Sequence, residues 1–259
     1  MATPKKALQI GINYIGMDGE LKGCINDVLN MKRYLIAEGY LPENIRVMTE
    51  ASENPAMHPT AANIMREIKA LVAGATSSSE LFFNYSGHGG SIRDMGGDEG
   101  DRKDETICPL DYQTSGQITD DMLRAYLIDP LPVGAKITCL LDSCHSGTVM
   151  DLKYNWVGSS TIPRAYSMVV SRAKVTNCKS ICISGCRDEQ FSADATIAGQ
   201  NQGAMTYAFL TSINENKKKR KRPTHKELIE EMGKNLQDKK FDQVPQMSAG
   251  REPDMNSTF

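Results

Sequence analysis

The sequence lacks any apolar run near the roughly 20 residues that a membrane-spanning helix needs, and it contains no internal repeat. It also lacks a strong charge of one sign, because the formal net charge of the 259 residues is −2. That balance gives no reason to expect nucleic acid or an anionic membrane as the main partner. The opening residues MATPKKALQIGIN hold too short an apolar segment for a signal peptide and predict a strand instead.

The composition is typical of a globular protein, with 40% hydrophobic and 24% charged residues. The chain is long enough for one large α/β domain, and we expect a single domain over 1–259. Seven cysteines is an odd number. Without a signal peptide they indicate reduced thiols, and we therefore expect a cytoplasmic protein.

Short apolar runs alternate with segments of helical spacing along most of the chain. Apolar runs of this kind are typical of a mostly parallel central β-sheet flanked by helices on both faces. We expect loops at 86–105 and 151–177, and a solvated basic run at 214–223. The predicted strands are 6–12, 45–49, 81–85, 136–142 and 180–184, and the predicted helices are 24–37, 60–71, 119–127, 204–213 and 224–236.

The stretch LLDSCHSG places the thiol of Cys144 just after a predicted strand. His145 is a poor base for it, because neighbouring side chains point to different sides and a base must come within about 3 Å of the thiol. The stretch NYSGHGG, which contains His88, follows another predicted strand. Parallel strands deliver the segments that follow them to the same edge of the sheet. We therefore predict Cys144 as a nucleophile and His88 as its base.

Other interpretations of these residues are possible from the sequence. Cys144 alone is equally typical of a buried structural thiol. His58 and His225 have no comparable setting and are expected at the surface.

The glycines that flank His88 allow an unusual backbone path and supply N–H donors for an oxyanion.

YSGHGG and DSCHSG, in this order and each ending a strand, resemble the two catalytic motifs of the metacaspases, which are caspase-like cysteine peptidases. GCINDV, ITDD, MDL and SADATIAGQNQGAMTYAF are also similar to type I metacaspase segments, so the resemblance covers most of 7–259. It implies a caspase-like fold with a large-subunit-like part at 1–155, a loop at 156–178 and a small-subunit-like part at 179–259. The long N-terminal prodomain common in type I members is not part of this sequence.

The resemblance implies cleavage of protein or peptide substrates after Arg or Lys. It assigns the pocket for the basic side chain to Asp142, Asp27, Cys24 and Ser86, and the oxyanion donors to the N–H groups of Gly89 and Cys144. A guanidinium or ammonium entering a pocket needs a carboxylate partner. Asp27 alone also suits an ordinary carboxylate at a helix start.

An acidic segment, RDMGGDEGDRKDE at 93–105, contains six carboxylates. By composition it is a solvated loop, although oxygen ligands also suit Ca²⁺. The resemblance implies Ca²⁺ as an activator outside the chemical step, with ligands at Asp104, Asp120, Asp121 and Asp151. Asp120 and Asp121 also suit the positive end of a helix.

Basic loops are candidates for self-cleavage, given the implied preference for Arg and Lys. The basic run at 217–222 is otherwise typical of a solvated loop or a nuclear import signal. The candidate self-cleavage residues are Arg164, Arg172, Lys174, Lys217 and Arg220. Cys178, Cys182 and Cys186 have no fourth metal ligand nearby, so core packing is favoured over a zinc site.

Two other functions remain open from the sequence. A transpeptidase on the same fold would pass the acyl group to an amine. A non-catalytic calcium-binding or aggregate-binding adaptor would use the fold without its chemistry. The resemblance also implies a monomer.

Overall fold

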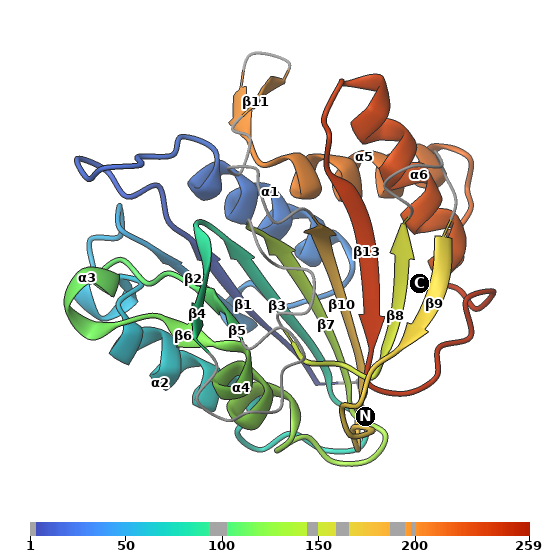
Figure 1. Cartoon of the computed structure of the whole chain (residues 1–259), viewed down its shortest axis with the longest axis horizontal. Helices are drawn as coiled ribbons and strands as arrows, with labels where there is room; N and C mark the ends of the chain where they lie inside the picture. Colours follow the sequence, from blue (N-terminus) through green and yellow to red (C-terminus); the bar gives the residue numbers. More distant parts are fainter. Residues whose placement is uncertain (1–3, 94–102, 144–149, 159–165, 187–194, 198–199) are drawn as a thin grey trace.

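An eight-stranded β-sheet forms the centre of the molecule (Figure 1). The computed structural model describes residues 4–93, 103–143, 150–158, 166–186, 195–197 and 200–259. The strand order in the sheet is β2-β1-β3-β7-β10-β13-β8-β9. The strands are β1 (Lys5–Gly11), β2 (Ile45–Thr49), β3 (Glu80–Ser86), β7 (Lys136–Asp142), β8 (Tyr154–Gly158), β9 (Tyr166–Val170), β10 (Lys179–Cys186) and β13 (Val244–Ala249).

The first five strands in this order are parallel, and the three that follow are antiparallel. The five parallel strands are the five that the sequence predicts, because each is buried and apolar over most of its length. The expectation of a mostly parallel sheet is confirmed.

Helices cover both faces of the sheet and make three layers (Figure 1). One face carries α1 (Cys24–Ala37), α5 (Ala204–Lys218) and α6 (His225–Asp238), whose buried side chains form one core cluster. The other face carries α2 (Ala61–Val72), α4 (Asp120–Leu123) and the π-helical turn η3 (Arg124–Ile128), which form a second cluster. Shorter helices are α3 (Tyr112–Ser115), η1 (Pro42–Asn44) and η2 (Pro55–Met57).

Local sequence signals begin two of these helices. The Thr60 hydroxyl accepts the N–H of Asn63 at the start of α2. At α6, Thr224 and Glu227 form the predicted capping box, in which each side chain accepts the other residue's backbone N–H. α1 also begins and ends where its apolar spacing predicts.

The expectation of a loop at 86–105 is wrong. β4 (Gly89–Arg93) and β5 (Lys103–Ile107) pair antiparallel, and β6 (Ile118–Thr119) joins β5 to complete a small three-stranded sheet. The glycines and charged residues of these strands interrupt the apolar pattern by which a strand is predicted from sequence. A β-hairpin, β11 (Ala195–Ile197) with β12 (Gln200–Gln202), precedes α5.

The loop expected at 151–177 is also partly wrong, because the segment contains β8 and β9. The same strands lie partly or wholly within the loop at 156–178 that the resemblance implies between its two subunit-like parts. β9 is the edge strand and is mostly exposed, so no alternation of apolar and polar residues marks it. The basic run at 214–223 is not all loop either, since α5 extends to Lys218.

His225, the first residue of α6, was expected at the surface, and this expectation is wrong. His225 is buried, with 9% of its surface exposed, and its Nδ1 lies 3.0 Å from the Ser257 carbonyl oxygen. His58 is half-buried and its Nε2 lies 2.8 Å from the Ser52 carbonyl oxygen. Among the described helices, none combines the length and the apolar character that crossing a membrane requires.

Candidate active site

The two predicted catalytic segments leave adjacent strands at the same edge of the sheet. Ser86 at the end of β3 is the register partner of Asp142 at the end of β7. The Gly87 N–H donates to the Asp142 carbonyl oxygen at 3.2 Å, so the two chains stay together beyond the strands. His88 lies two residues beyond Ser86, and Cys144 follows Asp142 by two residues in the sequence. Cys144 itself lies outside the described residues.

The His88 ring is held by a backbone carbonyl. Its Nε2 lies 2.6 Å from the carbonyl oxygen of Gly19. A carbonyl oxygen only accepts, so Nε2 carries the proton of this hydrogen bond. In the neutral imidazole the lone pair is then on Nδ1, which is the atom able to take a proton from a thiol.

Two buried tyrosines hold the backbone on either side of the His88 side chain. The His88 N–H donates to the Tyr14 hydroxyl at 3.1 Å, and the Tyr85 hydroxyl donates to the His88 carbonyl oxygen at 2.6 Å. The Tyr14 ring also packs against the His88 ring, with centroids 4.6 Å apart. Burial raises the pKa of both phenols, so they stay protonated and neutral.

Two backbone features accompany the tyrosine pair. A Cβ on Gly87 would lie 2.7 Å from the Tyr85 hydroxyl, so only glycine fits between this pair and the strand end. Tyr14 has a φ of 54°, a conformation that costs a non-glycine residue about 1–3 kcal/mol and gathers at functional sites. The sequence carries no sign of this role for Tyr14 and Tyr85, because a tyrosine in an apolar run is typical of a buried core residue.

The polar residues predicted to bind the substrate's basic side chain come from three elements, α1, β3 and β7. Asp27 of α1 and Asp142 of β7 are both fully buried, at 0% and 1% exposure. The Ser86 hydroxyl donates to Asp27 Oδ2 at 2.6 Å. The structure therefore brings together the three polar residues that the family resemblance assigned to one pocket, from positions far apart in the chain.

The N-terminus of α5 holds both carboxylates. The Gly203 N–H donates to the two oxygens of Asp27 at 2.9 and 3.0 Å, and the Thr206 N–H donates to Asp142 Oδ2 at 2.8 Å. These donors are at the positive end of the helix, which stabilises anions. The Oδ2 atoms of Asp27 and Asp142 lie 2.7 and 2.2 Å from the position of a Cβ on Gly203. The carboxylates are thus within about 5 Å of each other.

Two further predicted residues lie nearby in different settings. Cys24 is buried in the same apolar cluster as Tyr14 and Tyr85. Gly89 begins β4, directly after His88. The roles assigned to them, in the substrate pocket and the oxyanion site, stay predictions.

The four predicted calcium ligands are only partly gathered. Asp104 on β5 and Asp120 on α4 are buried, whereas Asp121 is exposed and Asp151 is half-buried. The Asp120 carboxylate accepts the N–H groups of Glu105, next to Asp104, and of Asp121. Within the described ranges, no group of three or more His, Cys, Asp or Glu residues is arranged to hold a metal ion. Asp104 and Asp120 carry carboxylate oxygens, the ligand type that Ca²⁺ takes, and the assignment of the four aspartates to a calcium site stays a prediction.

A buried arginine connects this region to the segment that follows Cys144. Arg124 is 9% exposed and belongs to η3, directly after α4. Its guanidinium donates to the carbonyl oxygens of Asp151 and of Lys174, the latter at 2.8 Å, and pairs with Asp129 at 2.9 Å. Asp151 has a φ of 44°, so this bond supports a second strained residue.

The self-cleavage candidates fall in unlike settings. Arg172 and Lys174 are exposed in the irregular segment between β9 and β10. Lys217 is inside α5 and pairs with Glu38 at 2.5 Å, while Arg220 follows the end of that helix. Arg164 lies outside the described residues.

The cysteines with a spacing of four are core residues where the structure describes them. Cys178 and Cys182 are buried free thiols, at 0% and 3% exposure. Burial raises the pKa of both, which makes them poor metal ligands and poor nucleophiles. The prediction of core packing is confirmed for these two.

The three-layer arrangement and the two segments leaving β3 and β7 define a caspase-like α/β fold. A crystal structure of a Geobacter sulfurreducens protein superposes with a TM-score of 0.67 at 25% identity, covering 97% of this chain and 95% of the other. The expected fold class is confirmed.

Residues 5–153 match the family described as metacaspase, peptidase C14 domain. The chain is 37% identical over 300 residues to Metacaspase-1 of Mycosarcoma maydis, covering 100% of this chain and 73% of the relative. It is 38% identical over 299 residues to Metacaspase-1 of Kluyveromyces lactis, covering 98% and 68% respectively. The chain therefore belongs to the metacaspase family, whose members are cysteine-type peptidases.

Proposed function

We propose that this chain is a calcium-activated cysteine endopeptidase that cleaves proteins or peptides after Arg or Lys. The observation that carries the specificity is the pair of buried carboxylates, Asp27 and Asp142, beside the strand end that bears His88. Two buried carboxylates close together favour a positively charged ligand. A guanidinium also forms bidentate hydrogen bonds with a carboxylate.

The catalytic residues of this proposal are Cys144 and His88. Nδ1 of His88 takes the thiol proton, and the Cys144 thiolate attacks the substrate carbonyl carbon. The N–H groups of Gly89 and Cys144 stabilise the oxyanion that forms. The C–N bond then breaks, the amine leaves with the proton from His88, and an acyl-enzyme remains. Water, deprotonated by His88, hydrolyses the thioester and releases the acid.

The Gly19 carbonyl and the tyrosine pair support this chemistry. The carbonyl fixes Nε2 as the protonated atom and stabilises the imidazolium that forms when Nδ1 accepts the thiol proton. Tyr14 and Tyr85 hold the backbone of His88 so that the ring does not reorient between the two proton transfers. Preorganisation of this kind avoids a reorganisation cost in the transition state.

Calcium in this proposal is bound by Asp104, Asp120, Asp121 and Asp151. The ion would supply positive charge to two buried carboxylates and tie β5 and α4 to the segment that follows Cys144. Arg124 already links the same segment to η3 through the Asp151 carbonyl oxygen. Calorimetric titration of the Cys144→Ala chain with Ca²⁺, with Asp120→Asn as the variant, tests binding apart from activity. Equal binding in both proteins argues against this site.

Self-cleavage is proposed at Arg172 or Lys174. A peptidase binds its substrate extended, and these two residues lie in an exposed irregular segment. Lys217 is less suitable, because cleavage there requires the end of α5 to unwind and the Lys217–Glu38 ion pair to break. Intact-mass analysis after addition of Ca²⁺ locates any cut, and the absence of new fragments argues against self-cleavage.

The decisive experiment is hydrolysis of fluorogenic peptides ending in Arg, Lys, Asp or Leu, with Ca²⁺ and with chelator. We expect turnover of the Arg and Lys peptides only, dependent on Ca²⁺ and abolished by Cys144→Ala. Asp142→Asn should lower kcat/KM for the Arg peptide about 10- to 100-fold, because a charged hydrogen bond is lost. Asp238→Asn, at an exposed position at the end of α6, is the matched control.

Two rival functions give different outcomes. A transpeptidase would give a product with the mass of an added amine, with little free acid. A calcium-binding or aggregate-binding adaptor would keep its function in Cys144→Ala and show no turnover. The proposal also places the enzyme in the cytosol, with access to the nucleus, as a monomer. The free thiols of Cys139, Cys178 and Cys182 support a reducing compartment.

A further inference from the structure

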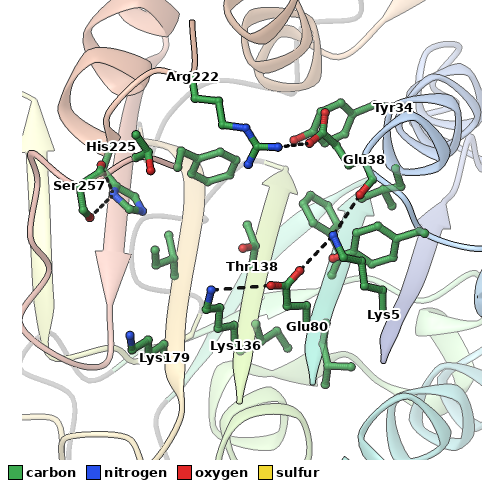
Figure 2. A pocket seen from close by; sticks show the side chains of 18 residues that line it. Lys5, Tyr34, Glu38, Glu80, Lys136, Thr138, Lys179, Arg222, His225 and Ser257 are labelled. Atoms are coloured by element: carbon green, nitrogen blue, oxygen red, sulfur yellow. Dashed lines mark hydrogen bonds and ion pairs between the residues drawn. The ribbon is translucent and has the colours of Figure 1, made fainter. Parts of the chain in front are cut away.

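A second pocket lies at the opposite end of the parallel strands from His88. It has a volume of about 500 Å³, within the range of about 300–1,000 Å³ that small-molecule sites occupy. Its floor is the sheet face under α1, and Thr138 of β7 lies near its middle (Figure 2). Four basic residues, Lys5, Lys136, Lys179 and Arg222, and two acidic residues, Glu38 and Glu80, are among the residues that line it.

The pocket floor contains a row of charges across four neighbouring strands. Lys5 of β1 is the register partner of Glu80 of β3, Glu80 is the partner of Lys136 of β7, and Lys136 is the partner of Lys179 of β10. Register partners in parallel strands place their side chains on the same face of the sheet. The row therefore reads plus, minus, plus, plus, and it ends on two lysines side by side. Like charges directly opposite each other on neighbouring strands are destabilising.

The carboxylates of the pocket are already engaged by other cations. Glu80 pairs with Lys5 at 3.1 Å and more loosely with Lys136 at 3.7 Å. Glu38 pairs with Lys217 at 2.5 Å and with Arg222 at 3.6 Å. Within the described part of the chain, Lys179 has no acidic partner. The side chains that line the pocket therefore carry a net positive charge, with Lys136 and Lys179 side by side on the sheet.

We propose that this pocket binds a small anion with two or more negative charges, held between Lys136 and Lys179 with Arg222 facing them across the pocket. Figure 2 shows the two lysines next to each other on one side and Arg222 on the other. A phosphoryl group or a polycarboxylate has the required charge, and charge-assisted hydrogen bonds to lysine are strong. The buried side chain of Phe82 lines the same pocket and gives it an apolar wall.

The test is calorimetric titration of the full chain carrying Cys144→Ala, which prevents self-cleavage, with pyrophosphate and with citrate. We expect binding of at least one probe, weaker by about tenfold in Lys179→Gln and weaker at high salt, because the lysines are partly exposed. Pyrophosphate alone would identify a phosphoryl ligand, and comparable binding of both would identify a general multivalent anion. Lys234→Gln, an exposed lysine of α6 outside the pocket, is the matched control.

A charge reversal gives a second readout that needs no probe. Lys179→Glu replaces the like-charge pair with an opposite-charge pair, so we expect a higher Tm without any anion and no probe binding. The proposal is overturned if neither probe binds, or if Lys179→Gln and Lys234→Gln weaken binding equally. A Tm that falls in Lys179→Glu would also overturn it, because the two lysines would then not repel each other.

Discussion

Gly203 donates its backbone N–H to both carboxylate oxygens of Asp27, at 2.9 and 3.0 Å. The two residues come from different helices, since Asp27 lies in α1 and Gly203 precedes the first residue of α5. The same glycine is in contact with the Asp142 carboxylate. One backbone position therefore fixes the spacing of the two charges that we assign to substrate recognition.

The first prediction is that Gly203→Ala destroys this spacing. The new Cβ would lie 2.2 Å from Asp142 Oδ2 and 2.7 Å from Asp27 Oδ2, and both distances are shorter than any van der Waals contact between non-bonded atoms. The φ of Gly203 is −71°, so the backbone itself accepts alanine and the effect is purely steric. We expect kcat/KM for an Arg peptide to fall more than about tenfold and stability to fall by about 1–3 kcal/mol.

Steady-state kinetics and thermal unfolding check this prediction together. An unchanged kcat/KM would show that the carboxylates can move apart without loss, and that their spacing does not set specificity. Circular dichroism shows whether the fold is kept.

The sequence predicts the parallel core of the fold well, because local patterns decide it. The bounds of α1 and of β7 are as predicted, since both are apolar on the sides that they bury. β4, β5 and β9 were missed because their pairing is decided by neighbouring strands rather than by their own alternation. Edge strands and glycine-rich strands lack the pattern that buried strands carry.

The site was predictable to a smaller extent. Only the family resemblance predicted that Asp27 and Asp142 lie close together. Their spacing in the sequence does not predict it, because the two residues are far apart in the chain. Gly203 carries no signal at all, because its φ is ordinary and its importance lies in what surrounds it. Tyr14 and Tyr85 appear as core residues in the sequence, and only the fold shows that their hydroxyls face His88.

The second prediction concerns the hydroxyl of Tyr14. Tyr14→Phe keeps the ring against His88 and removes the acceptor of the His88 N–H and a donor to the Cys108 carbonyl oxygen. We expect kcat to fall with little change in KM, because the base is misplaced while the substrate pocket is intact. The buried groups left unpaired should also cost about 1–3 kcal/mol of stability.

Tyr112→Phe is the matched control for this change. Its ring makes an edge contact with Tyr14 at 6.3 Å, and its own hydroxyl is on the exposed side, near Gln113. Near-normal kinetics are expected from it. If both variants lose the same activity, the Tyr14 hydroxyl has no special role in placing His88.

The third prediction concerns Arg124, which we interpret as a positioning residue for the segment after Cys144. Arg124→Met removes the donors to the carbonyl oxygens of Asp151 and Lys174. We expect a loss of at least about 2 kcal/mol of stability and faster cleavage by trypsin after Arg172 and Lys174. Both effects are measured in the Cys144→Ala chain, by denaturant unfolding and limited proteolysis.

Asp129→Asn separates the ion pair of Arg124 from its carbonyl bonds. Asp129 is about half exposed, and its loss leaves the two carbonyl contacts in place. Surface ion pairs contribute little, about 0–1 kcal/mol. Trypsin sensitivity as great in Asp129→Asn as in Arg124→Met would contradict the carbonyl-holding role.

The fourth prediction is a gain in stability from Asn84→Leu. Asn84 is fully buried on β3, and neither polar atom of its side chain has a hydrogen-bond partner among the described residues. Leucine has a similar shape and no polar atoms in its side chain. The substitution therefore removes the cost of burying the Asn84 amide without hydrogen bonds, about 1–3 kcal/mol. Thermal unfolding should show a higher Tm. A lower Tm would reveal a buried water bound to Asn84.

The fifth prediction is a loss of stability in mild acid that depends on His225. Burial lowers the pKa of His225 below its ordinary value of 6.5, so the folded protein holds the ring neutral. Below pH 6.5 the unfolded chain binds a proton that the folded chain does not yet bind, and the free energy of unfolding falls as the pH falls. The loss continues until the lower folded pKa is passed, and above pH 6.5 this histidine contributes no pH dependence. His225→Gln should flatten that part of the profile in urea unfolding series. An unchanged slope in His225→Gln would assign the acid sensitivity to other groups.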